Sequence, residues 1–270
     1  DSFCIQGTYQ WDTGGFGLGV AYTRDMSDPN VSKDYSLFLN PAFYQSWGSF
    51  DGGSGVFSVH FEGMFGWGET TDKDDNTQDK VGYGLYGDAV YEYIEGGSIT
   101  LAGWYVDGDK DPNGPDPGTK SRTLVNMGNF APFLVAYNGT TLGNGVYSNS
   151  GNDIPLGHWG MGILGNHPIN PQILFNYGVG YFQLANPSYE LVITDPGNTY
   201  KARKKDLGWE IDVGFSFELM ENLSFETQFG YMFNGRALDN YTPNADPTKE
   251  GTWIDIDDTF AWANVLAFSF

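Results

Sequence analysis

The fold is decided by residues 206–220, which read DLGWEIDVGFSFELM. Large apolar side chains occupy every odd position from Leu207 to Leu219, and Asp, Gly, Glu or Ser occupies each even position between them. Successive side chains of a β-strand point to opposite faces, whereas a helical pattern repeats every 3.6 residues. The stretch therefore predicts a long strand with one apolar face and one polar face.

A second strand follows after a three-residue link, Met220–Asn222. From Leu223 to Phe233 the odd positions carry four aromatic residues, one Leu and one Thr, and the even positions between them are mostly polar or small. Two long alternating runs joined by so short a link predict a β-hairpin.

The same period of two recurs along the chain, and no convincing helical pattern is present. We expect strands near 3–12, 16–26, 36–48, 54–68, 81–94, 97–107, 157–167, 171–185, 206–219, 222–235 and 259–270. The alternation is weaker in two of them, where Pro41 and Pro168 make the boundaries uncertain. Short links alternate with long, charge-rich connections at 27–35, 69–80, 108–156, 186–205 and 236–258.

These strands are longer than the ~5–6 residues usual in soluble sheets and match the ~9–11 residues of a strand that crosses a bilayer at a tilt. Trp and Tyr gather toward both strand ends, as at two membrane interfaces. Tight turns at one end and long polar loops at the other complete the pattern of a transmembrane antiparallel up-and-down β-barrel, all-β and spanning 1–270 as one domain. A soluble β-sandwich or β-propeller is the alternative.

Composition excludes several other classes. With 34 acidic and 13 basic residues, the net charge is −21, which disfavours nucleic acid as a partner. No run approaches the ~18–20 apolar residues of a membrane helix. One cysteine allows no internal disulfide. The first residues do not resemble a signal peptide, so we expect that one was removed or that the sequence starts partway through a longer product.

The polar faces of the predicted strands supply the candidate functional residues. The candidate pore-lining residues are His60, Glu62, Asp88, Glu92, Glu210, Asp212, Glu226 and Gln228. No Lys or Arg falls on these predicted inward runs. Carboxylates in a dry core would cost several kcal/mol each unless paired, so a water-filled, cation-preferring lumen is expected.

The 108–156 connection is too long for a plain loop, and its uncharged second half either enters the lumen as a constriction or covers a neighbouring subunit. It begins with DKDPNGPDPGTK, residues 109–120. A partial calcium-loop pattern places Asp109, Asp111, Asn113 and Asp116 as candidate ligands, but Lys120 stands where such loops end in Glu. A solvated acidic turn is the alternative, and no other cofactor is expected.

Enzymatic chemistry has little support in the sequence. The three histidines, His60, His158 and His167, lack metal-ligand spacing and the chain has no nucleophile elbow. We expect no enzyme, and His60 is interpreted as a polar residue that lines the lumen.

The final stretch TFAWANVLAFSF, residues 259–270, resembles the C-terminal signature of bacterial outer-membrane β-barrel proteins, which barrel assembly machinery recognises through a terminal Phe, here Phe270. Residues 206–240 resemble the penultimate hairpin of alginate-export-like porins. The resemblance is good over the final third and looser upstream. It implies a Gram-negative outer membrane, with lipid and lipopolysaccharide as surroundings. It also implies a barrel of about 14–18 strands, a size that leaves an aqueous lumen. A homotrimer is compatible with the resemblance.

Eleven strands are predicted, whereas single-chain bacterial barrels have even counts. We therefore expect that strand 3–12 does not pair with strand 259–270 and that N-terminal strands are missing or one was overlooked. The function expected is a porin for passive diffusion of small hydrophilic solutes or ions. The alternatives are a structural or adhesive barrel, a barrel enclosing a partner protein, and a polysaccharide exporter, which would need an arginine-rich lining.

Overall fold

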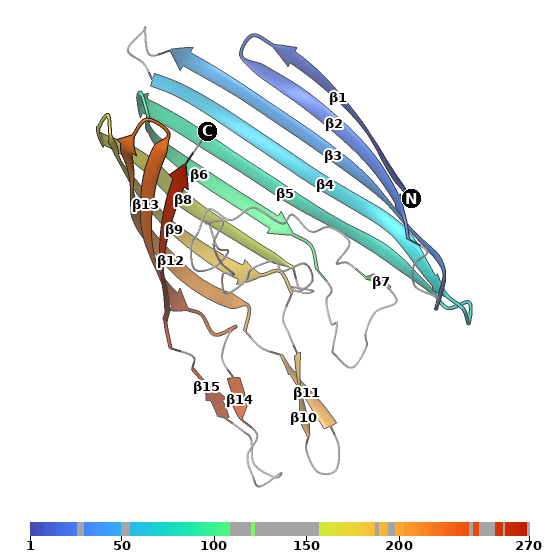
Figure 1. The fold of residues 1–270 in the computed structure, drawn as a ribbon. Coiled ribbons are helices and arrows are strands. Elements are labelled where there is room, and N and C mark those ends of the chain that lie inside the picture. Colours follow the sequence, from blue (N-terminus) through green and yellow to red (C-terminus); the bar gives the residue numbers. More distant parts are fainter. Residues whose placement is uncertain are drawn as a thin grey trace.

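The computed structural model describes residues 1–25, 30–49, 55–108, 120–121, 157–186, 189–193, 198–202, 204–237, 240–242, 252–255 and 257–268. Eleven long strands form one antiparallel up-and-down sheet in the order β1-β2-β3-β4-β5-β6-β8-β9-β12-β13-β16 (Figure 1). Each long strand pairs with the long strands that precede and follow it in sequence.

The long strands run from 10 to 19 residues. Their bounds are β1 Ser2–Trp11, β2 Gly14–Arg24, β3 Val31–Ser49, β4 Gly55–Asp72, β5 Thr77–Ile94, β6 Gly97–Val106, β8 His158–Asn170, β9 Ile173–Leu184, β12 Asp206–Met220, β13 Leu223–Asn234 and β16 Thr259–Phe268. The short strands are β7 Lys120–Ser121, β10 Tyr189–Ile193, β11 Asn198–Ala202, β14 Asn240–Thr242 and β15 Thr252–Ile254.

All eleven strands expected from the sequence are present, which confirms an all-β antiparallel up-and-down architecture. Pro41 and Pro168, which obscured two strand boundaries in the sequence, both lie inside strands. Pro41 opposes Leu18 of β2, but the ladder between β3 and β4 passes from Leu39 to Ala42 without a partner for the proline. Because proline has no N–H to donate, it is tolerated where the ladder is interrupted. Pro168 lies next to a register shift near the end of β8.

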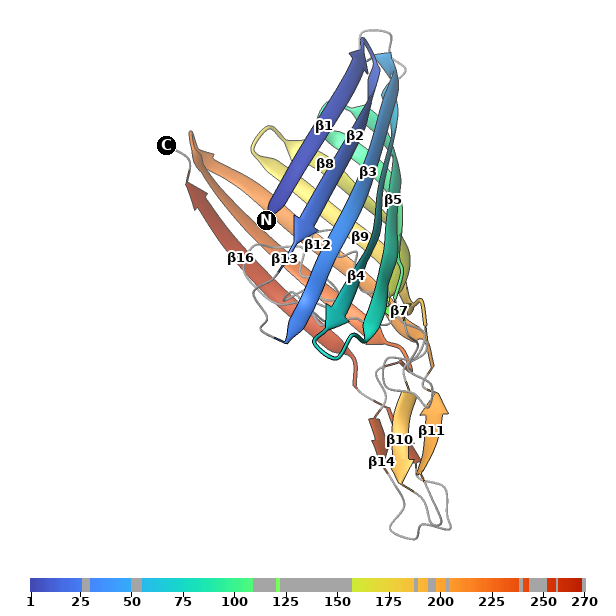
Figure 2. The same ribbon diagram turned by 90° about the vertical axis from the view of Figure 1, so that its right-hand side faces the viewer.

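The sheet curves into a trough, with β1 at one margin and β16 at the other (Figures 1 and 2). No ladder joins β1 to β16 among the described residues, as the odd strand count predicted. Eleven alternating strands make the two margins run in the same direction, so a direct pairing of β1 with β16 would be parallel. The open sheet is thus compatible with part of a barrel wall.

The expected long connections differ from the structure in four places. The connection predicted at 27–35 is shorter, because β3 already begins at Val31. Residues 69–80 were predicted as a loop, and this is wrong: β4 continues to Asp72, β5 begins at Thr77, and a tight turn joins them. Asp72 Oδ1 accepts hydrogen bonds from the backbone N–H of Asp74 (2.8 Å) and Asn76 (2.9 Å), and Asn76 Nδ2 donates to Asp72 Oδ2 (2.9 Å). These hydrogen bonds lower the pKa of the Asp72 carboxyl, and the bond from the Asn76 side chain has the largest effect.

The other two differences are short hairpins within the connections 186–205 and 236–258. The hairpins β10–β11 and β14–β15 each pair antiparallel, and they extend from the same end of the sheet (Figure 1). Of the long 108–156 connection, the structure describes only Gly108 and β7, which pairs parallel with the start of β5. The predicted constriction in this connection lies outside the described residues.

A small buried cluster forms on one face of the sheet. Its members are Trp104, Phe182, Leu184, Leu207, Met232 and Ala237, from β6, β9, β12, β13 and the turn after β13. The rings of Trp104 and Phe182 lie 5.9 Å apart. The opposite face carries most of the large hydrophobic side chains and leaves them exposed, so the main apolar surface of this protein lies outside its core.

Candidate functional site

The two faces of the curved sheet have opposite chemistry. Register places Glu210 beside Met232, and Ile211 beside Tyr231, on alternate faces. Glu210 and Met232 are fully buried, whereas Ile211 is 45% and Phe233 46% exposed. We call the face with Glu210 and Met232 the concave face and its opposite the convex face. This alternation follows from the two-residue period of a strand.

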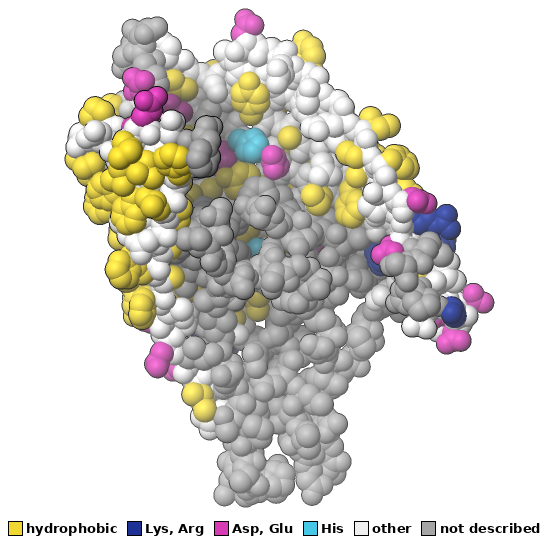
Figure 3. Space-filling model, in the orientation of Figure 1, with side chains coloured by type: hydrophobic (Ala, Val, Ile, Leu, Met, Phe, Trp, Pro, Cys, Tyr) yellow, Lys and Arg dark blue, Asp and Glu magenta, His cyan; other side chains and the backbone are white. Residues whose placement is uncertain are grey.

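The convex face carries exposed large hydrophobic residues on all eleven long strands. Examples from β1 to β16 are Phe3, Phe16, Trp47, Phe61, Tyr91, Leu101, Met161, Val179, Ile211, Phe229 and Trp262. In the space-filling view, hydrophobic side chains cover the flanks, while histidine and acidic side chains are visible in the hollow (Figure 3). So large and continuous an exposed apolar surface is the mark of a surface that contacts something other than water.

The concave face near the margin β1 is built from small and polar residues. On β1 it carries Ser2, Cys4, Gln6, Thr8 and Gln10, and on β2 it carries Gly15, Gly17, Gly19, Ala21 and Thr23, as the register of the two strands requires. Cys4 is a free, exposed thiol. This face is therefore compatible with water along the margin of the trough.

All eight predicted pore-lining residues lie on the concave face. On β4 and β5, His60 stands directly opposite Asp88, Glu62 opposite Tyr86, and Glu92 opposite Val56. That these residues line a pore stays a prediction. The two-residue alternation of the strands correctly predicted that they share one face of the sheet.

His60 is the centre of a polar cluster on that surface. Its Nε2 lies 3.4 Å from Glu62 Oε1, and its Nδ1 lies 3.4 Å from Asp88 Oδ2. The Tyr86 ring meets the imidazole edge-on, with centroids 5.8 Å apart. The His60 and Glu62 side chains are 36% and 43% exposed, and Asp88 only 13%. The cluster therefore places one imidazole between two carboxylates on the concave face.

The remaining four predicted residues lie on β12 and β13. Glu210 and Asp212 oppose Met232 and Gly230, while Gln228 and Glu226 oppose Gly214 and Ser216. Glu210 is fully buried next to the apolar cluster, and Asp212, Glu226 and Gln228 are half-buried. The four thus run in a line from the buried cluster toward the short-turn end.

One expectation about charge is wrong. The sequence placed no basic residue on the inward runs, but β5 begins four residues earlier than expected, and its even parity puts Lys80 on the concave face. Lys80 Nζ contacts both carboxylate oxygens of Asp34 at 2.8 Å. This pair is neutral overall and lies near the long-connection end of the sheet, so it leaves the acidic character of the middle of the face unchanged.

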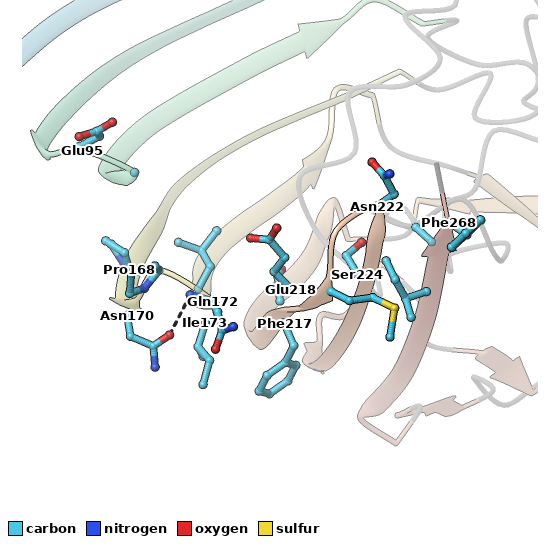
Figure 4. Close-up of a pocket in the computed structure, with 17 residues that line it drawn as sticks. Glu95, Pro168, Asn170, Gln172, Ile173, Phe217, Glu218, Asn222, Ser224 and Phe268 are labelled. Atoms are coloured by element: carbon cyan, nitrogen blue, oxygen red, sulfur yellow. Dashed lines mark hydrogen bonds between the residues drawn. The ribbon is translucent and has the colours of Figure 1, made fainter. Parts of the chain in front are cut away.

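A cavity of about 1110 Å³ opens at the short-turn end (Figure 4). Its lining comes from the β5–β6, β8–β9 and β12–β13 turns and from the end of β16. Glu95 and Glu218 supply its charge, Asn170, Gln172 and Asn222 supply amides, and no Lys or Arg lines it among the described residues. Glu218 has an even position in the predicted strand 206–219 and so falls on its polar face, but the sequence did not predict that the turns build a wide mouth around it.

Several concave-face residues were overlooked by the sequence reasoning. Asn176 of β9 donates from Nδ2 to Ser216 Oγ of β12 at 3.0 Å, and Asn166 of β8 lies on the same face. The sequence held a signal for them, because Asn166 has an even position on β8 like Leu164, and Asn176 has an even position on β9 like Leu174. Their small size and lack of charge concealed them.

The candidate calcium ligands Asp109, Asp111, Asn113 and Asp116 lie outside the described residues, as does Phe270. Within the described ranges, no group of three or more His, Cys, Asp or Glu side chains could hold a metal ion. The same part of the chain has no helix that is long and apolar enough to cross a membrane. Comparison with family models and with curated proteins finds no match to this chain.

Proposed function

We propose that the chain forms the wall of an outer-membrane porin of a Gram-negative bacterium. Its channel passes small hydrophilic solutes or ions by passive diffusion. The observation that carries the proposal is the inverted polarity of the sheet. Eleven strands expose large apolar side chains on the convex face and turn carboxylates, amides and glycines to the concave face.

Two physical arguments support this assignment. Aqueous solvent on both sides would leave the convex face as an unfavourable exposed apolar surface, whereas lipid removes that cost. Lipid also requires that backbone N–H and C=O groups pair with each other, which continuous antiparallel ladders of 10 to 19 residues achieve between the margins. The resemblance of the C-terminal third to alginate-export-like porins agrees with both arguments.

We further propose that the channel prefers cations. Glu62, Glu92 and Glu226 are only half-buried on the concave face, and Glu95 and Glu218 lie at the mouth cavity. The described basic residue on this face, Lys80, is paired with Asp34. Fixed negative charge along a narrow route raises the local concentration of cations, and this effect weakens as salt screens it.

Planar bilayers test both parts. The full-length protein, refolded in detergent and added to a bilayer, is expected to give stepwise ohmic conductance. Across a KCl gradient, the reversal potential is expected to have the sign of potassium selectivity and to decline as ionic strength rises. A protein that inserts with native heat-modifiable mobility yet never conducts would favour the structural, adhesive or partner-enclosing alternatives. Anion selectivity at low salt would favour a polyanion exporter and overturn the cation preference.

A further inference from the structure

A second, smaller cavity lies on the concave face between β8, β9, β12 and β13. Its volume is about 330 Å³, at the lower end of the ~300–1,000 Å³ range of small-molecule sites. Leu174 and Ser216 line both this cavity and the wide mouth. The small cavity is therefore reached from the mouth and lies deeper along the strands. The buried cluster around Phe182 and Met232 lies further along the same strands.

The lining combines amides, a hydroxyl and carboxylates. Asn166, Asn176 and Gln228 provide amides, Ser216 a hydroxyl, and Asp212 and Glu226 carboxylates. Leu164 and Leu174 provide apolar wall on the same face. The mouth cavity carries the same kinds of polar group, but turn residues and two prolines form much of its wall, whereas strand residues form the wall of the smaller cavity.

Part of this polar lining has hydrogen-bonding capacity to spare. In the ranges that the structure describes, the Asn176 amide nitrogen donates to Ser216, but the side chains of Asn166, Glu226 and Gln228 make no hydrogen bond or ion pair. Glu226 and Gln228 are half-buried, so their solvation is incomplete. A ligand that satisfies both the amide donors and the carboxylate acceptor gains the most from this arrangement.

We propose that this cavity is a binding subsite for a neutral, polyhydroxylated solute of about monosaccharide size. Sugar hydroxyls both donate and accept, so different hydroxyls of one solute can serve the Gln228 and Asn166 amides and the Glu226 carboxylate. An ammonium group only donates and would leave the amide N–H groups without an acceptor. The C–H groups of the solute pack against Leu164 and Leu174. The subsite deepens the proposed function by naming a solute class, and it rests on that function only for its place on a transport route.

Binding is measured without conduction by equilibrium dialysis of radiolabelled glucose against the full-length protein in detergent micelles. Gln228→Leu removes an amide from the cavity and is expected to weaken glucose binding about tenfold, the effect of about 1.4 kcal/mol of lost hydrogen bonding. Gln6→Leu is the matched control, because Gln6 lies on the concave face of β1 outside the cavity. It is expected to leave binding unchanged. Glu226→Gln, which keeps shape, is expected to weaken binding and serves where Gln228→Leu does not refold.

Ethanolammonium is the second probe, at the same concentrations. The subsite is overturned if glucose fails to bind, if the Gln228 and Gln6 variants bind it equally, or if only ethanolammonium binds and depends on Glu226. Bilayer recordings separate this result from the proposed function. Glucose binding that depends on Gln228, in a protein that never conducts, keeps the subsite and rejects the porin. Conductance without glucose binding keeps the porin and rejects the subsite.

Discussion

Val213 offers the most direct test of a lipid-facing convex face. It lies seven residues from each end of β12 (Asp206–Met220) and opposes Tyr177 and Phe229 on the neighbouring strands. At about 3.3 Å per residue, seven residues span about 23 Å along the strand, or about 16 Å after a 45° tilt. In the proposed membrane setting, Val213 therefore falls close to the middle of an apolar band about 25 Å tall.

Replacing Val213 with arginine is expected to lower the free energy of unfolding from lipid vesicles by about 2–4 kcal/mol, the cost of arginine at a bilayer midplane. In a soluble sheet the same position, 41% exposed, would accept arginine for about 0.5 kcal/mol or less. The two outcomes differ by more than the error of a urea titration followed by tryptophan fluorescence.

Two control variants make the measurement specific for depth and for face. Leu219→Arg lies on the convex side of the same strand but at the short-turn end, where it is 52% exposed, and it is expected to cost about 0–1 kcal/mol. Ser58→Arg lies on the concave face of β4 and is expected to cost similarly little, because in the proposed porin water reaches that face. Equal costs for Val213→Arg and Ser58→Arg would refute the assignment of the two faces to lipid and water.

Three further measurements follow from the same arrangement. Glu62→Gln is expected to reduce potassium selectivity, and the reduction should be larger at 0.01 M salt, where the Debye length is about 30 Å, than at 1 M; equal reductions would contradict a screened field. Cys4 on the concave face is expected to react rapidly with a water-soluble maleimide in vesicles, whereas a Cys4→Ser, Ile5→Cys variant reacts slowly; equal rates would place both in water. Gly208→Ala is expected to lower the free energy of unfolding by more than about 1 kcal/mol in urea titrations, because Gly208 has φ of 119° and a Cβ would meet Phe233 O. Gly103→Ala is the control and is expected to cost less, because its Cβ would make only an ordinary contact with Gly160 O.

The long strands could be predicted because their signal is local. Each strand repeats its own two-residue pattern, so a window of ten residues is enough to identify it and to assign its faces. The same locality explains the correct placement of His60, Glu62 and Glu226 on one surface. Whether a residue has an odd or an even position along its strand decides which face it lies on, whatever its partners are.

The ends of strands depend on partners that a local pattern does not contain. Residues 69–80 are rich in charge and were therefore predicted as a loop. In the structure, Lys80 pairs with Asp34, and Lys33 Nζ lies 2.9 Å from Glu69 Oε1 on adjacent strands. Such cross-strand pairs make charged residues compatible with a continued ladder.

Cross-strand contacts escaped prediction for a related reason. The hydrogen bond from Asn176 to Ser216 joins residues 40 positions apart, and its existence depends on the register between β9 and β12. Register follows from turns and bulges, such as the irregularity between Asp206 and Gly208. Parity alone assigns both residues to the concave face, but it cannot say that they meet or that a cavity lies beside them.

The two margins of the sheet connect the fold to the proposed membrane setting. β1 and β16 run in the same direction, and neither has a ladder on its outer side among the described residues. In lipid those backbone groups need partners, and antiparallel barrels supply them by neighbours that run the opposite way. A strand antiparallel to β16 is also antiparallel to β1, so an odd number of additional strands, from this chain or from another, closes the wall with antiparallel pairs throughout. Direct contact of the two margins cannot do so, since it would introduce a parallel pair.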